Sequence, residues 1–194
     1  SDLRLIQYND SLFIGTSFMP KEISVELMNL KTEKVVNSVN FPLKPKEGEY
    51  SRPYECKIAT EMNFIVAAYR YINRLEIYKL SDQKFQLNTI IGDANNQYDL
   101  YRLNKDNEMI LHYSDIVCGK NQIYALYRGV KEKELSSANS KIEVYSYDGT
   151  HLRTFDLGRS IEKILVDESS MRIYAFDRNE EKDIVFCYAI ESNT

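Results

Sequence analysis

The sequence predicts an all-β protein, a β-propeller of about four four-stranded antiparallel blades in one domain over residues 1–194. Three observations predict this fold: a six-residue pattern recurs about every 50 residues, apolar runs and polar turns surround each copy, and no stretch has helical periodicity. The aromatic residues agree with it. There are 15 Tyr, 8 Phe and no Trp, and tyrosine suits half-buried positions on strands.

The recurring pattern is Ile, Val or Tyr, Ala, an apolar residue, Tyr or Asp, then Arg. It occurs at Ile65–Arg70, Ile123–Arg128 and Ile173–Arg178, with a degenerate copy at Phe13–Phe18. Self-similarity at this period is typical of repeat architectures. Each copy is therefore expected to form the second strand of a blade.

The neighbouring runs supply the other strands. Apolar runs that precede the pattern predict the first strands, at Leu3–Tyr8, Tyr54–Ala59, Asp115–Cys118 and Ile161–Val166. Alternating apolar and polar runs predict the third strands, at Ile23–Leu27, Leu75–Tyr78, Ile142–Tyr147 and Asp183–Tyr188. Fourth strands are expected at Lys34–Phe41, Lys84–Ile91 and His151–Leu157, the last after an Asp148-Gly149 hairpin turn. The blades then span about 1–43, 54–91, 112–157 and 160–190.

Two stretches interrupt the period and are expected to be surface loops. They are Gly92–Met109, between the second and third blades, and Val130–Ser140, within the third. Long loops in compact domains often bind ligands. At least one of the two is a candidate for such a role.

The blocks Asp115–Cys118, Ile123–Gly129 and Ile142–Gly149, with Val166–Glu168 and Ile173–Ala175, resemble the TolB-like six-bladed propeller proteins of the Bacteroidetes cell envelope. The similarity is good over residues 112–190 and faint over 1–111. It implies that this chain is the C-terminal portion of a six-bladed propeller. It also implies a periplasmic or cell-envelope location, with a lipid anchor in the full-length form. A closed ring of four blades is the alternative.

Composition excludes several classes of function. The net charge of −4 and the pI near 5.4 argue against a nucleic-acid surface, and no apolar run is long enough to span a membrane. The three cysteines, Cys56, Cys118 and Cys187, lack CxxC spacing and are expected to be unpaired and shielded. With two histidines and no HExxH motif, a zinc site is not expected.

The repeated arginines Arg70, Arg128 and Arg178 are the candidate ligand-binding residues. Since they end equivalent second strands, they are expected on one rim, where guanidinium groups could bind a carboxylate, a phosphate or an acidic sugar. Alternatively, each arginine pairs with an acid of a first strand, namely Glu55, Asp115 or Glu162. The tyrosines of the repeats could stack on sugars but are better explained by packing between blades; they are Tyr69, Tyr124, Tyr127, Tyr145, Tyr147 and Tyr174.

The chain carries no GxSxG, GxGxxG or GxxxxGK[ST] motif and no recognisable calcium loop. We therefore expect no catalytic residues, no cofactor and no metal. The favoured hypothesis is a non-enzymatic binding or scaffold protein that holds a protein or glycan on a propeller face. The alternative is a metal-dependent, lactonase-like propeller hydrolase with a metal on its axis.

Overall fold

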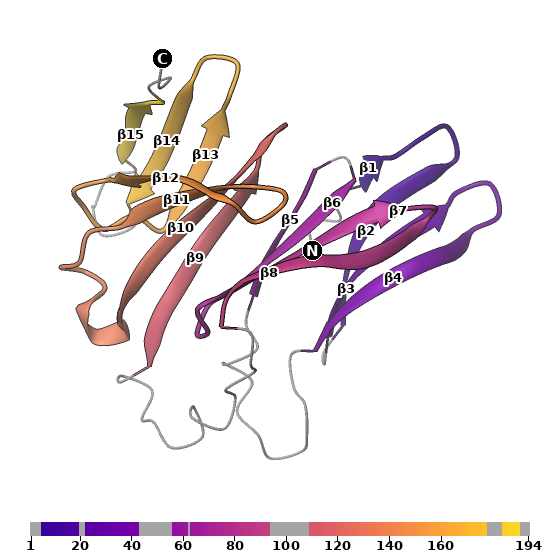
Figure 1. Cartoon of the computed structure of the whole chain (residues 1–194), viewed down its shortest axis with the longest axis horizontal. Helices are drawn as coiled ribbons and strands as arrows, with labels where there is room; N and C mark the ends of the chain where they lie inside the picture. The colour runs from indigo at the N-terminus through magenta and orange to yellow at the C-terminus, as the bar shows by residue number, and fades with distance from the viewer. Residues whose placement is uncertain are drawn as a thin grey trace.

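The computed structural model describes residues 5–19, 22–42, 56–61, 63–93, 109–177 and 184–190. These residues form four antiparallel sheets in chain order, as the sequence predicts (Figure 1). The first two sheets contain β1 (Leu5–Gln7), β2 (Leu12–Met19), β3 (Glu22–Asn29) and β4 (Lys34–Pro42), then β5 (Cys56–Glu61), β6 (Phe64–Tyr69), β7 (Arg74–Ser81) and β8 (Lys84–Gly92).

The third sheet contains β9 (Ile110–Cys118), β10 (Gln122–Lys131), β11 (Lys141–Ser146) and β12 (His151–Asp156), with a 3-10 helix, η3 (Glu132–Glu134), between β10 and β11. The fourth sheet contains β13 (Lys163–Asp167), β14 (Arg172–Asp177) and β15 (Ile184–Ala189). In every sheet the strands pair in sequence order, which is the meander of a propeller blade.

Turn chemistry closes the outer hairpin of the third sheet where the sequence predicts it. Gly149 has a φ of +92°, a conformation that costs glycine little. Its amide donates to the Ser146 carbonyl at 3.0 Å, and the Asp148 carboxylate accepts from the Thr150 amide at 2.9 Å. The Asp-Gly pair therefore fixes the register between β11 and β12.

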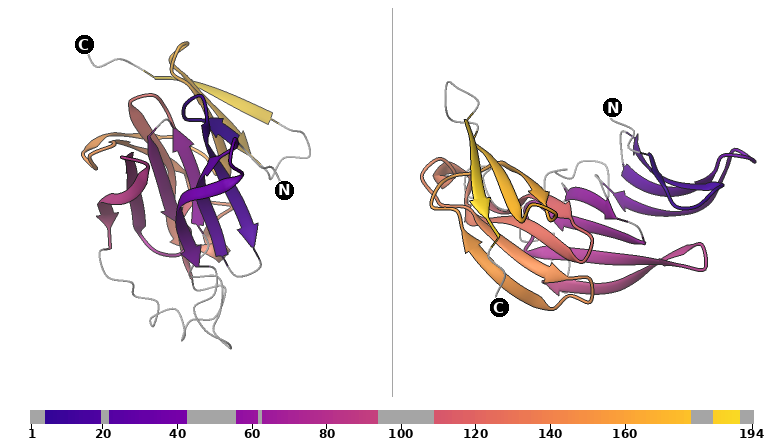
Figure 2. Two further views of the ribbon diagram at one scale, coloured as in Figure 1. Left: turned by 90° about the vertical axis from the view of Figure 1, so that its right-hand side faces the viewer. Right: turned by 90° about the horizontal axis from the view of Figure 1, so that it is seen from above.

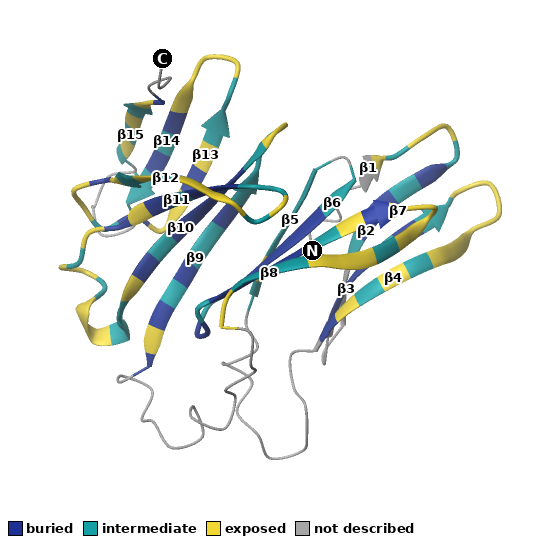
Figure 3. Cartoon of the chain, viewed as in Figure 1, coloured by how far each residue is buried: buried dark blue, intermediate teal, exposed yellow. Residues whose placement is uncertain are grey.

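Three apolar cores lie between successive sheets. A second strand of a blade can contribute side chains to two of these cores, one on each face of its sheet. In β6, Ile65 and Ala67 pack towards the first sheet, whereas Val66 and Ala68 pack towards the third. Figure 3 shows the result, with buried residues concentrated on the second strands and exposed residues on the outer strands β4, β8 and β12. Burying one Ile or Val side chain contributes about 1.5–3 kcal/mol, so the cores between blades hold the sheets in place.

The sheets follow one another from the N-terminal to the C-terminal side, and the two end sheets stand apart (Figure 1, Figure 2). The first strands β5, β9 and β13 lie side by side on the inner edge. The three cores join the first sheet to the second, the second to the third, and the third to the fourth. The described residues therefore form an open row of blades and not the closed four-bladed ring that was the alternative.

The tyrosines of the repeats mostly pack between sheets. Tyr69, Tyr124 and Tyr145 belong to the three cores, and Tyr127 and Tyr147 pack against one of them. The rings of Phe64 and Tyr147 stack across the second and third sheets, with centroids 4.1 Å apart. Packing, not a sugar-stacking surface, therefore explains these five side chains.

One prediction about the cysteines is wrong. All three are unpaired, and Cys56 and Cys118 are partly covered, but Cys187 is exposed. Side chains of β15 alternate between partly buried and exposed, and Cys187 shares the exposed register with Val185 and Ala189. That register faces away from the core between the third and fourth sheets.

Candidate functional site

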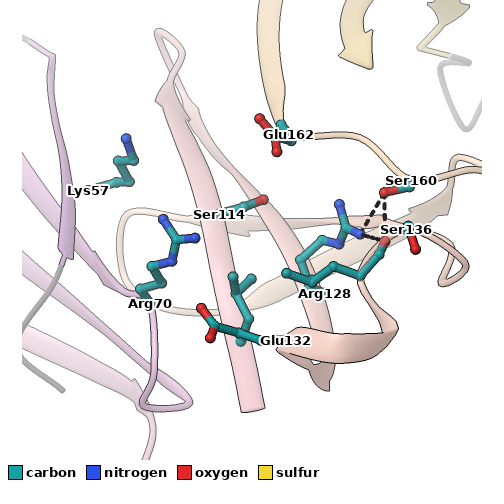
Figure 4. A pocket seen from close by; sticks show the side chains of 10 residues that line it. Lys57, Arg70, Ser114, Arg128, Glu132, Ser136, Ser160 and Glu162 are labelled. Atoms are coloured by element: carbon teal, nitrogen blue, oxygen red, sulfur yellow. Dashed lines mark hydrogen bonds between the residues drawn. The ribbon is translucent and has the colours of Figure 1, made fainter. Parts of the chain in front are cut away.

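Two of the three repeated arginines line one cavity. Arg70 directly follows β6 and Arg128 lies in β10, and both border a cavity of about 360 Å³ (Figure 4). Arg178 lies outside the described residues. The rest of the lining comes from the second, third and fourth sheets and their connections: Lys57, Leu111, Ser114, Glu132, Leu135, Ser136, Ser160 and Glu162.

Arg128 is almost fully buried, with 6% of its surface exposed. Its guanidinium donates to the carbonyl oxygens of Ile161 and Leu135, and to the Ser160 hydroxyl at 2.8 Å. All of these acceptors are neutral, and burial lowers the pKa of Arg128 from its ordinary value. Its Nε has no acceptor among the described residues. No hydrogen bond joins this guanidinium to an acid, but the charges of Glu162, a first-strand acid, and of Asp177 oppose the lowering of its pKa.

The first-strand acids differ from one another in their contacts. The Asp115 carboxylate accepts a hydrogen bond from the Ile164 amide at 2.9 Å, which ties the third sheet to the fourth. Burial raises the pKa of Asp115, although this hydrogen bond opposes the shift. Glu162 precedes β13 and lines the cavity, and Glu55 lies outside the described residues.

The second sheet supplies the opposite wall of the cavity. Lys57 is an exposed residue of β5, and Arg70 is half-buried in the β6–β7 turn. The Arg70 guanidinium lies over the Tyr71 ring, 5.5 Å from its centroid, in a cation–π contact. Figure 4 shows Lys57 and Arg70 on one side of Ser114, with Arg128 and Ser160 on the other.

The loop between β10 and β11 forms a third wall and is held at both ends. Tyr71 donates its hydroxyl to the Glu132 carboxylate at 2.5 Å, which joins the loop to the second sheet. At the far end, Ser140 is fully buried; its amide donates to the Arg159 carbonyl at 2.8 Å, and its hydroxyl accepts from the Ile161 amide at 2.7 Å. The Val130–Ser140 stretch that the sequence marks as a candidate binding loop therefore borders the cavity in a fixed conformation.

The charges of the lining nearly balance. Among its described residues, three cations, Lys57, Arg70 and Arg128, face two carboxylates, Glu132 and Glu162, which leaves one net positive charge. Within the described part of the chain, no group of three or more His, Cys, Asp and Glu residues could hold a metal ion. The lining is therefore suited to ion pairs and hydrogen bonds.

The sequence of the chain matches a known protein family. The TolB-like 6-blade propeller-like family matches residues 4–169, which is most of the chain. The chain belongs to this family. None of the curated proteins matches the sequence significantly.

Solved structures show that this TolB-like chain shares its fold with parts of larger proteins. The WD40 domain of Toxoplasma gondii coronin has a TM-score of 0.57 at 9% identity, over 98% of this chain and 43% of the coronin chain. Hydrazine synthase from Kuenenia stuttgartiensis has a TM-score of 0.57 at 11% identity, over 98% and 47%. The chain thus spans less than half the length of either. At these identities the likeness shows the fold alone.

In this TolB-like structure, Arg128 departs from the sequence expectation in one respect. It lies inside β10 rather than at its end, because the strand continues to Lys131 past register shifts on both sides of Tyr127. Sequence reasoning missed Lys57, Ser114 and Ser160, which belong to no repeated pattern and lie outside the predicted loops.

Over the ranges that the structure covers, no helix is long and apolar enough to cross a bilayer.

Proposed function

We propose that this TolB-like chain is a non-enzymatic binding or scaffold protein that holds a protein or glycan through an acidic group in the cavity. Arg70 and Arg128 line that cavity and are the proposed binding residues. Arg178 is proposed with them from the repeat alone, since it lies outside the described residues.

The buried charge of Arg128 carries this proposal. A cation removed from water costs several kcal/mol unless an anion or strong acceptors offset the loss. Its acceptors are neutral and its Nε lacks an acceptor in the described part of the chain. Glu162 and Asp177 offset part of this cost through their charges. An anion in the cavity would offset more of it, and Lys57 and Arg70 would add to the attraction.

Titration calorimetry with a panel of acidic peptides and acidic oligosaccharides tests this function. We expect at least one panel member to bind, and Arg70→Gln to weaken that binding roughly tenfold, because a charge-assisted hydrogen bond is lost. Arg172→Gln is the matched control, since Arg172 is exposed and lies outside the lining. If no panel member binds, or if both variants behave alike, the proposal is wrong.

The location and origin of the protein are also proposals. Membership of a TolB-like family supports a periplasmic or cell-envelope location. That the chain is the C-terminal portion of a six-bladed protein from Bacteroidetes stays a prediction. Fractionation of cells that express the full gene product tests the location.

The alternative of a metal-dependent hydrolase also stays a prediction. Metal analysis of the purified protein tests it, because stoichiometric calcium or zinc would favour an axial metal site.

A further inference from the structure

The charge of the cavity limits which anion it can hold. Counted over its described residues, the lining has one net positive charge, and its two carboxylates, Glu132 and Glu162, stand among the three cations. A phosphate monoester carries up to two negative charges, which exceed this balance and increase its repulsion from both carboxylates. A single carboxylate balances the lining without excess charge. The cavity is therefore matched to a monoanion.

The other lining groups indicate what carries that carboxylate. Ser114 and Ser136 offer hydroxyl groups, whereas the Ser160 hydroxyl already donates to the Leu135 carbonyl at 2.8 Å. The two glutamates offer acceptors for amide N–H groups. Among the lining residues that the structure describes there is no aromatic side chain, so these residues offer a sugar ring no face to stack on. Peptide groups on either side of a carboxylate need only such hydrogen-bonding partners. The lining thus favours a peptide over a glycan.

The size and rigidity of the cavity agree with a short segment of chain. Ligand pockets usually enclose about 300–1,000 Å³, so a volume of 360 Å³ holds a side chain or a chain end and its neighbours. Two walls are fixed before binding, by the Tyr71–Glu132 hydrogen bond and by the contacts of Arg128 with Leu135 and Ser160. Pre-formed walls reduce the entropy lost on binding.

We infer that the cavity binds a carboxylate of a protein segment, either an acidic side chain or a C-terminal carboxylate. Lys57 and Arg70 of the second sheet bind the carboxylate oxygens, and the buried charge of Arg128 forms the wall behind them. This inference rests on the proposed function and names the class of its ligand.

The test uses titration calorimetry on the full chain with four probes. The first is a short peptide blocked at both ends with one central glutamate, and the second has glutamine in its place. The third is the glutamine peptide with a free C-terminal carboxylate. The fourth is an oligosaccharide of uronic acids, which presents carboxylates on sugar rings.

We expect the first peptide, the third or both to bind at least about tenfold more tightly than the blocked glutamine peptide, because only they carry a carboxylate. The stronger of the two identifies the source of the carboxylate. Arg70→Gln and Lys57→Met should each reduce the tighter binding by a similar factor. Their matched controls, Arg172→Gln and Lys79→Met, change exposed residues outside the lining and should leave it unchanged. Lys57 is itself exposed, so Lys57→Met keeps the test valid if Arg70→Gln fails to fold.

The outcomes separate this inference from the proposed function. If the oligosaccharide binds with the same dependence on Arg70 and the peptides do not, the peptide class is wrong and the proposed function stands. If the blocked glutamine peptide binds as tightly as the others, the carboxylate requirement is wrong. If no probe binds, or if the control variants lose as much affinity as the cavity variants, both the inference and the proposed function fail.

Discussion

Replacing Arg128 with alanine should destabilise the fold by about 3 kcal/mol. The substitution removes hydrogen bonds to Ile161, Leu135 and Ser160, and a bond from a charged donor contributes about 1.5–3 kcal/mol. Burial of the guanidinium offsets several kcal/mol of that gain, and the lowered pKa of Arg128 has the same cause. About 3 kcal/mol remains and would be lost, together with one of the attachments of the β10–β11 loop to the segment before β13; the contacts of Ser140 would remain.

Urea unfolding followed by circular dichroism measures this loss as a change in midpoint at constant slope. Arg128→Lys should lose less stability than Arg128→Ala, because lysine keeps a charged donor. It should still be less stable than the original protein, because lysine cannot reach three acceptors in a planar fork. Arg172→Ala is the control and should change the free energy of unfolding by less than about 0.5 kcal/mol, since Arg172 is exposed. If Arg128→Ala is as stable as this control, Arg128 does not hold the loop, and the pre-formed wall of the cavity must be given up.

Three further outcomes are expected. Gly92→Ala should lower the melting temperature and cost at least about 2 kcal/mol, because Gly92 has a φ of +84° and a Cβ there would lie 2.0 Å from the Asn73 carbonyl oxygen; an unchanged melting temperature would contradict this geometry. Thiol titration of the native protein should show one fast cysteine, which Cys187→Ser abolishes, because burial raises the pKa of the other two thiols to about 12; three fast thiols would refute it. Burial lowers the pKa of His112, so as the pH falls the unfolded chain binds a proton at this residue before the folded chain does. The free energy of unfolding should therefore fall as the pH drops below about 6.5, and His112→Gln should reduce this pH dependence in urea titrations at several pH values. An unchanged pH dependence would exclude His112 as its cause.

The strands were predictable because the burial of each strand determines a local pattern of apolar and polar residues in the sequence. The second strands are continuous apolar runs because both of their faces are buried, as in β6, where every residue from Ile65 to Tyr69 is buried. The start of the third sheet was less predictable. β9 begins at Ile110, five residues before the expected Asp115, since its first half alternates around His112 and contains polar residues.

The site was predictable only where it coincides with the repeat. Arg70 and Arg128 were found because they occupy the same repeat position, and the structure places both on one cavity. Lys57 and Ser160 are about a hundred residues apart, and only the stacking of three blades brings them together. No local pattern reports such a juxtaposition.

A second repeated feature was present in the sequence and was missed. Glu76-Ile77-Tyr78 and Glu143-Val144-Tyr145 occupy equivalent third strands, and in both the tyrosine hydroxyl donates to the glutamate at 2.8 Å. Each glutamate also faces an alanine of the second strand, Ala67 or Ala125, whose small side chain leaves room for the carboxylate. The pair thus has the same geometry in two blades, as expected of a structural element copied with the repeat.

Arg70 and Arg128, in contrast, have different surroundings in the two blades, because the loops that follow them differ in length. Arg70 begins a four-residue turn between β6 and β7, so its guanidinium stays half-exposed over Tyr71. Arg128 is followed by the longer connection from Glu132 to Ser140, whose carbonyl at Leu135 covers the guanidinium and accepts from it. One repeat position therefore yields a half-exposed cation in the second blade and a buried cation in the third. Because the lengthened loop makes this difference, the third blade is where the propeller departs from its own repeat and where the cavity forms.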